Sequence, residues 1–167
     1  MDEGEQKWIA VYTRARAERT VARQLQEKGL TSFVPLQRHL HNWSDRSKWV
    51  VQPLIPSYIF VLLSPAEHHQ LFDIPGLVRV VMFNGRIAVI RPSEIEFFRR
   101  TEQHPETKAI GMHLLERGEH VEIVGGLFAG YSGSMVRTEN SYSVAVRIEE
   151  LAYAFVVKVR ATDIKVT

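Results

Sequence analysis

The sequence of 167 residues contains no cysteine, no long apolar run and little net charge. Without cysteine, a disulfide scaffold, a cysteine nucleophile and a thiolate metal cluster are all excluded. No run approaches the roughly 18 apolar residues that a membrane-spanning helix needs. The first residues, Met1 to Lys7, are polar and acidic, unlike the basic start of a secretory signal. We therefore expect a cytoplasmic protein that does not associate with a membrane.

Motifs for catalysis and for metal or nucleotide binding are also scarce. His39 and His41 would share one side of a strand, whereas His68 and His69 would diverge on a helix, so neither pair predicts a metal site. The glycine-rich segment 125–133 lacks the Lys-Ser/Thr ending of a P-loop and precedes a strand. We expect no catalytic residue, metal or cofactor. A hydrolase that uses His39, His41 or His68 is the least favoured alternative.

The residues that are present have the composition of an ordinary packed protein, 45% hydrophobic and 24% charged. The charge is unevenly spread, because residues 1–100 carry 14 Lys and Arg against 10 Asp and Glu, whereas residues 101–167 carry 7 against 9. The basic excess is concentrated in one short segment that contains Arg14, Arg16, Arg19 and Arg23. A second basic stretch contains Arg38, Arg46, Lys48 and two histidines.

Alternating strand-like and helix-like segments predict an α+β fold for residues 1–100. We expect four strands, at 8–13, 31–40, 49–51 and 58–63. A hairpin is expected around Asn84-Gly85, and helices are expected at about 16–28, 65–72 and from 92 onward. In the first helix Val21 and Leu25 lie on the apolar face and Gly29 is suited to follow the last turn. This order predicts one sheet with helices packed on it.

Residues 101–167 differ from residues 1–100 in their hydrophobic pattern. Residues 101–113 show little periodicity and contain Pro105 and Gly111, which is typical of a linker. After the linker, short β-branched runs predict five strands, at 119–124, 134–138, 143–148, 154–160 and 164–166. We expect a small β-barrel here.

The arginine-rich segment is a candidate anion-binding surface. Arg16, Arg19 and Arg23 would share an exposed face at the start of a helix, where the macrodipole disfavours cations unless an anion is bound nearby. Phosphates of a nucleic-acid backbone are suitable anions. The alternative is a solvated cationic face whose arginine stems cover apolar surface.

The proline-rich segment 52–61 is a candidate protein-binding surface. Two prolines before a central strand cannot donate ladder hydrogen bonds, so Ile55 and Tyr58 are candidates for an exposed apolar edge. The alternative is that Tyr58 and Phe60 belong to the core, which should hold for at least one of them.

Three segments resemble the N-terminal (NGN) domain of the NusG family of transcription elongation factors: Trp8 to Tyr12 followed by the arginine-rich helix, 53–61, and 74–83. Residues 118–133 resemble the family's C-terminal KOW module. The resemblance covers nearly the whole chain in the family's order. It implies an N-terminal α/β sandwich at 1–100, with an antiparallel sheet flanked by helices. A linker at 101–113 and an SH3-like β-barrel (KOW) at 114–167 would follow.

The resemblance also implies a non-enzymatic, monomeric factor that grips the clamp helices of bacterial RNA polymerase and suppresses pausing or termination. Carried over by position, the polymerase-binding residues are Tyr12, Ile55, Pro56, Tyr58, Phe60 and Phe83. The residues near the exposed non-template DNA strand are Arg14, Arg16, Arg19 and Arg23. Phe128 in the KOW turn would help to recruit a further partner, such as a small-subunit ribosomal protein or Rho.

Within the family, residues 42–50 are most similar to UpxY-type antiterminators encoded with surface-polysaccharide loci. The housekeeping factor usually has phenylalanine where Ile55 stands and glycine where Ser57 stands, which favours a specialised paralog. In one specialised relative the KOW domain refolds as a helical hairpin, but β-branched runs such as 156–159 favour the barrel here. A ribosome-associated KOW-type RNA-binding protein is the alternative, although the acidic excess of residues 101–167 argues against it.

Overall fold

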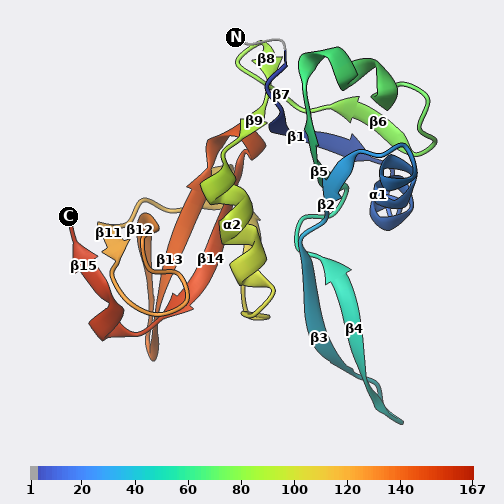
Figure 1. Ribbon diagram of the computed structural model, residues 1–167. Coiled ribbons are helices and arrows are strands. Elements are labelled where there is room, and N and C mark those ends of the chain that lie inside the picture. The colour runs from blue at the N-terminus through green and yellow to red at the C-terminus, as the bar shows by residue number, and fades with distance from the viewer. Residues whose placement is uncertain (1–3) are drawn as a thin grey trace. The chain divides into compact units, whose positions relative to one another are not determined.

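The computed structural model describes residues 4–167, so residues 1–3 of the predicted N-terminal domain lie outside the described residues. Its contacts divide the chain into two compact units, an N-terminal unit that ends at Glu96 and a C-terminal unit, Phe97–Thr167 (Figure 1). The N-terminal unit combines helices with antiparallel sheets, and the C-terminal unit is built around one antiparallel sheet. The predicted α+β class is therefore confirmed. Within residues 4–167, no helix is long and apolar enough to cross a membrane.

The main sheet of the N-terminal unit is centred on strand β1 (Lys7–Thr13). The strand pairs along its length with β5 (Tyr58–Leu63), as expected for two buried apolar runs. On its other side it pairs with β6 (Leu77–Val80) and β9 (Val89–Ile90), and β2 (Thr31–Phe33) lies at the outer edge of β5. All of these pairings are antiparallel.

Helix α1 (Glu18–Glu27) buries its apolar face against one side of this sheet. Val21 and Leu25 are fully buried with Val11 and Ile59, and Gly29 follows the C-cap with φ of 80°. A left-handed φ is the conformation that glycine adopts without a steric penalty, which explains why the helix ends there. The helix begins two residues later than the apolar spacing predicted.

A separate two-stranded hairpin leaves the main sheet after β2. It consists of β3 (Leu36–Asn42) and β4 (Ser47–Pro53), which pair in register over their whole length. The single strand predicted at 31–40 is thus broken at Val34 and Pro35, because proline has no N–H for a continuous ladder. The hairpin extends away from the rest of the N-terminal unit (Figure 1).

The rest of the N-terminal unit follows the predicted order. The helix predicted at 65–72 is the 3-10 helix η1 (Pro65–Leu71). Asn84 and Gly85, both with positive φ, form the predicted turn between β7 (Met82–Phe83) and β8 (Arg86–Ile87). Helix α2 (Pro92–Thr101) then runs across the boundary between the two units.

The C-terminal unit contains the five predicted strands in a six-stranded antiparallel sheet of order β10-β14-β13-β12-β11-β15. These strands are β11 (His120–Ile123), β12 (Ser132–Thr138), β13 (Ser141–Ile148), β14 (Tyr153–Val159) and β15 (Ile164–Val166). Short 3-10 turns occur at Met112–Leu114, Glu149–Leu151 and Ala161–Asp163.

The sixth strand, β10 (Lys108–Gly111), lies inside the predicted linker. It pairs with the outer edge of β14, where Ala109 lies opposite Phe155. A sheet edge leaves backbone N–H and C=O groups unpaired, so a short segment with weak periodicity can still be ordered by pairing with it. The hydrophobic pattern of residues 108–111 alone does not predict that they form a strand, because the strand depends on pairing with β14.

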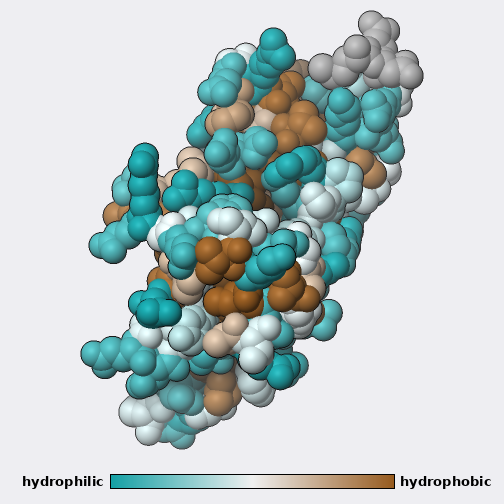
Figure 2. Space-filling view, turned by 90° about the vertical axis from the view of Figure 1, so that its left-hand side faces the viewer, coloured by the Kyte–Doolittle hydropathy of each residue, from teal (hydrophilic) through white to brown (hydrophobic). Residues whose placement is uncertain are grey.

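Hydrophobic and hydrophilic residues are interspersed on the molecular face that Figure 2 shows, where apolar side chains gather in small groups between polar ones. The exposed large apolar residues of the N-terminal unit include Leu40, Trp43, Trp49, Val51 and Phe72. Leu40, Trp43, Trp49 and Val51 belong to the β3–β4 hairpin or to the loop at its tip, and Val78, Met82 and Val89 are exposed elsewhere in the unit.

Candidate interaction surfaces

Two tyrosines meet where β1 ends and β5 begins. Tyr12 and Tyr58 are direct cross-strand neighbours, with ring centroids 5.5 Å apart in an edge-to-face arrangement. The guanidinium of Arg79, on the neighbouring strand β6, lies 5.3 Å from the Tyr12 ring centroid. Both tyrosines are partly exposed. The pair therefore offers aromatic contact area whose geometry is fixed by the strand register.

The other four predicted polymerase-binding residues differ in exposure. Pro56 is exposed and Phe83 is partly exposed, whereas Ile55 and Phe60 have 1% and 0% of their surface exposed. The Phe60 ring stacks on Phe33 of the adjacent strand β2, with centroids 6.4 Å apart. The expected exposed edge thus includes Tyr58 but not Ile55. The sequence could not distinguish them, because both alternatives place apolar residues in the same segment.

The segment that precedes β5 is tied to two other elements. The Ser57 N–H donates to Oε1 of Glu18 at 2.8 Å, and the Ser57 carbonyl accepts from the Thr13 N–H at 2.8 Å. Glu18 is buried in the first turn of α1. A hydrogen bond to a charged carboxylate is stronger than a neutral one, so this link fixes the loop that presents Pro56 and Tyr58. No local sequence pattern predicts this role for Glu18.

All four arginines of the arginine-rich segment are exposed. The expectation that Arg16 shares a helical face with Arg19 and Arg23 is wrong, because Arg16 has φ of 64° and precedes the helix. Arg14 also precedes α1. The guanidinium of Arg19 donates to the Val51 carbonyl of β4 at 2.9 Å, which links the helix to the β3–β4 hairpin.

A groove of about 480 Å³ connects these two candidate surfaces. Its lining includes Arg16 and Arg19 from the arginine-rich segment, Val51 from β4, and Pro56 and Ser57 from the loop before β5. Cationic side chains and the predicted protein-binding loop therefore border the same hollow. This arrangement suits a partner that presents both apolar groups and phosphates.

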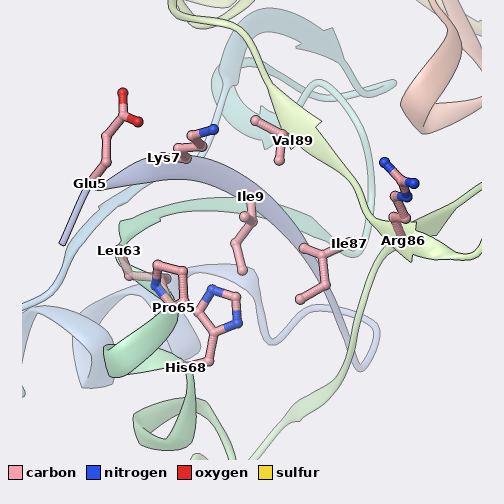
Figure 3. A pocket seen from close by; sticks show the side chains of 9 residues that line it. All are labelled: Glu5, Lys7, Ile9, Leu63, Pro65, His68, Arg86, Ile87 and Val89. Carbon is pink, nitrogen blue, oxygen red and sulfur yellow. The ribbon is translucent and has the colours of Figure 1, made fainter. Parts of the chain in front are cut away.

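A second hollow, of about 490 Å³, lies beside β1, β5 and η1 (Figure 3). Ile9, Leu63 and Ile87 form its apolar wall, while the charged ends of Glu5 and Arg86 point away from it. His68 also lines this hollow, beside Pro65. A catalytic site needs several converging polar groups, whereas most of this wall is apolar. In the described part of the chain, no three His, Asp or Glu side chains are placed so that they could hold a metal ion.

In the C-terminal unit, Phe128 lies in the turn between β11 and β12 and is only 3% exposed. Its ring contacts Phe97 of α2 and His104, each with centroids 5.4 Å away. The Arg100 guanidinium donates to the carbonyls of Leu127 and Ala129, at 3.1 and 3.3 Å. The second half of α2 therefore covers this turn, an arrangement that the sequence pattern does not predict.

Burial lowers the pKa of His104, and the nearby carboxylate of Glu106 opposes that shift. The imidazole Nδ1 lies 2.8 Å from the Thr107 hydroxyl. A histidine whose pKa is lowered by burial is neutral at pH 7, so it packs against Phe128 as an uncharged ring.

The N-terminal unit matches a known protein family. The family described as "Transcription termination factor nusG" matches residues 6–99, which is more than half of the chain. This range contains β1 with Tyr12, the arginine-rich segment, the β3–β4 hairpin and the loop with Pro56. No curated protein sequence matches the chain.

One solved structure supports the two-unit fold. A structure that describes domain interaction in Thermotoga maritima NusG has a TM-score of 0.59 and 17% identity, and the match covers 96% of this chain and 97% of that one. At this identity the likeness concerns the fold. A structure of the MjSpt4:Spt5 complex in conformation A is 17% identical over 96% of this chain and 97% of that one, but its TM-score is only 0.28. From its match over residues 6–99, this chain belongs to the NusG family, whose members are non-enzymatic transcription factors.

Proposed function

We propose that this protein is a bacterial transcription elongation and antitermination factor. In this proposal the N-terminal unit binds the clamp helices of RNA polymerase, and the C-terminal unit recruits a further partner. The observation that carries the proposal is the family match over residues 6–99, together with the Tyr12–Tyr58 pair beside a loop that hydrogen bonds hold in place.

The polymerase-binding surface is centred on Tyr12 and Tyr58, with Pro56 and Phe83 at its margin. Aromatic side chains at the centre of an interface contribute most of its binding free energy. Ile55 and Phe60 contribute indirectly, because they are buried and support the exposed residues of this surface by packing. The Glu18 carboxylate orders the loop before binding, so little conformational entropy is lost when the partner arrives.

In this proposal the exposed arginines bind the phosphates of the non-template DNA strand. Arg14, Arg16, Arg19 and Arg23 are all accessible, and Arg16 and Arg19 line the groove beside Pro56. Cations that neutralise phosphates release counterions, which makes such binding independent of sequence and sensitive to salt. The arginines would thus hold the strand without reading its bases.

The C-terminal unit would act as an SH3-like KOW module that recruits a small-subunit ribosomal protein or Rho. Its strand order, with β15 beside β11 and β14 beside β13, supports this assignment. Phe128 is the candidate contact residue. Because Phe97 and His104 pack on its ring, a partner that uses Phe128 has to displace the second half of α2.

We further infer a specialised role in antitermination at surface-polysaccharide loci. The motivation is the similarity of residues 42–50 to UpxY-type factors and the presence of Ile55 and Ser57 where the housekeeping factor has phenylalanine and glycine. Mapping polymerase occupancy across the genome with and without the protein tests this role. Changes confined to such loci support it, and a uniform change across all genes contradicts it.

Binding to purified core RNA polymerase tests the main proposal. Tyr58→Ala removes half of the exposed tyrosine pair, so we expect the Kd to rise by roughly 30-fold, as for an interface hot spot of about 2 kcal/mol. Phe72→Ala is the matched control, because Phe72 is an aromatic residue with 82% of its surface exposed outside this surface. Absence of binding to a clamp-helix fragment, or equal binding by both variants, contradicts the proposal.

A further inference from the structure

One face of the β3–β4 hairpin carries a cluster of three exposed apolar side chains and one arginine. Leu40 and Trp49 are directly paired across the two strands, as are Arg38 and Val51. Alternate residues of a strand share a face, so these four side chains lie on the same side of the hairpin. Leu40, Trp49 and Val51 have 50%, 53% and 44% of their surface exposed. The Arg38 guanidinium lies 4.6 Å from the centroid of the Trp49 ring.

A second tryptophan lies at the tip of the same hairpin. Trp43 is 43% exposed, with the His41 ring 4.2 Å away and the Arg46 guanidinium 5.4 Å away, both measured to its ring centroid. Its backbone N–H donates to the Arg46 carbonyl at 2.7 Å, which closes the tip. Each exposed tryptophan is therefore accompanied by an arginine and held by an ordered backbone.

The charge of the hairpin identifies the kind of partner. Residues 36–53 contain Arg38, Arg46 and Lys48 but one acidic residue, Asp45, and two histidines add further donors. An apolar protein surface would gain little from this cationic excess, whereas a polyanion with flat apolar rings would use both features. Single-stranded nucleic acid has that chemistry, because its bases stack on aromatic rings and its phosphates pair with Arg and Lys.

A hydrogen bond attaches the hairpin to the arginine-rich segment, which binds DNA in the proposed function. Arg19 donates to the Val51 carbonyl, and the Leu54 N–H donates to the Pro35 carbonyl at 2.8 Å at the base of the hairpin. A two-stranded hairpin is marginally stable alone, so these links determine its orientation. They make the hairpin continuous with the exposed arginines of the arginine-rich segment.

We propose that the β3–β4 hairpin is a base-stacking site for single-stranded DNA, in which Trp43 and Trp49 stack on unpaired bases while Arg38, Arg46 and Lys48 contact phosphates. The choice of DNA over RNA rests on the proposed function, which places the non-template strand beside Arg19. The stacking itself is sequence-tolerant, because every base has a flat π surface.

Tryptophan emission of the full chain tests the site directly. In a Trp8→Phe background the emission comes from Trp43 and Trp49, and titration with a short oligothymidylate should quench it in a saturable and salt-dependent manner. Trp43→Ala and Trp49→Ala, measured by anisotropy of a labelled oligonucleotide, should each weaken binding by roughly fivefold or more. Trp49→Phe should retain most of the affinity, because it keeps an aromatic ring. Phe72→Ala is the exposed aromatic control and should bind like the parent.

The outcomes separate this site from the rest of the proposed function. Loss of oligonucleotide binding in the tryptophan variants supports the hairpin site whether or not the parent protein binds polymerase, so failure of this site and failure of the proposed function are distinguishable. Arg19→Glu with Arg23→Glu should weaken oligonucleotide binding without abolishing the quenching of the hairpin tryptophans. Unchanged affinity in both tryptophan variants, or absence of quenching, overturns the stacking site. Tighter binding of an oligouridylate RNA overturns the assignment to DNA.

Discussion

Ser57 has a backbone conformation that residues with a side chain rarely adopt. Its φ is 70°, in the left-handed region, and it is held there by the hydrogen bonds to Glu18 and Thr13. The left-handed conformation costs a non-glycine residue about 1 kcal/mol. Glycine would avoid this cost, because it has no Cβ. The residue therefore stores strain in the loop that carries Pro56 and Tyr58.

Ser57→Gly should stabilise the protein by up to about 0.5 kcal/mol, because relief of about 1 kcal/mol of left-handed strain slightly exceeds the roughly 0.4–1 kcal/mol of entropy that glycine adds to the unfolded chain. Denaturant unfolding measures this difference. Gly29→Ala is the reciprocal control: Gly29 has φ of 80°, and no atom lies within 4 Å of the position that an alanine Cβ would take, so its cost comes from the backbone alone. A loss of stability in Ser57→Gly contradicts this expectation.

Helix α2 shows how one element can serve the core of the C-terminal unit. Phe97 is fully buried, and its ring lies within 5.1 to 6.1 Å of the rings of Phe98, Phe128, Tyr131 and Phe155, measured between centroids. The sequence pattern assigns the whole helix to the N-terminal domain, since its apolar spacing shows which face is buried but not what covers it. The aromatic cluster places its second half in the C-terminal unit.

Phe97→Ala should destabilise the C-terminal unit by about 3–5 kcal/mol, as expected when a large aromatic side chain is removed from a packed core. Thermal unfolding followed by circular dichroism checks this, with the exposed Phe72→Ala as control. Under the proposed function, the same variant should bind the proposed C-terminal partner more tightly, because Phe128 loses part of its cover. Equal stability of the two variants would show that the aromatic cluster contributes little.

At the scale of the whole molecule, the chain divides inside a helix. The predicted boundaries were 1–100, 101–113 and 114–167, whereas the contacts separate the units between Glu96 and Phe97. The segment predicted as a linker contributes β10 to the sheet of the C-terminal unit. A unit of this size gains a substantial share of its buried surface from each added element, because small domains bury less of their surface.

A fragment of residues 92–167 should therefore unfold at a higher temperature than a fragment of residues 114–167. The longer fragment keeps the aromatic cover of Phe128 and Phe155 and the partner strand of β14. Calorimetry on the two fragments measures the difference, with the full chain as reference. Identical midpoints would indicate that residues 92–113 act as a linker, as the sequence alone suggested.

The sequence by itself determined the features that depend on neighbouring residues. The apolar runs at β1 and β5, the Asn84-Gly85 turn, the end of α1 just before Gly29 and the five C-terminal strands follow from local periodicity and backbone preference. The resemblance of the N-terminal segments to the NusG family was likewise present in the residues and was confirmed by the match over residues 6–99.

The tertiary structure decided which distant residues meet. It placed Arg19 on the carbonyl of Val51, buried Ile55 and Phe60 while leaving Tyr58 partly exposed, and packed Phe97 on Phe128. Such contacts depend on how sheet edges and apolar faces far apart in the chain are brought together. A local pattern specifies that a side chain is buried, but its neighbour is selected only when the whole chain folds.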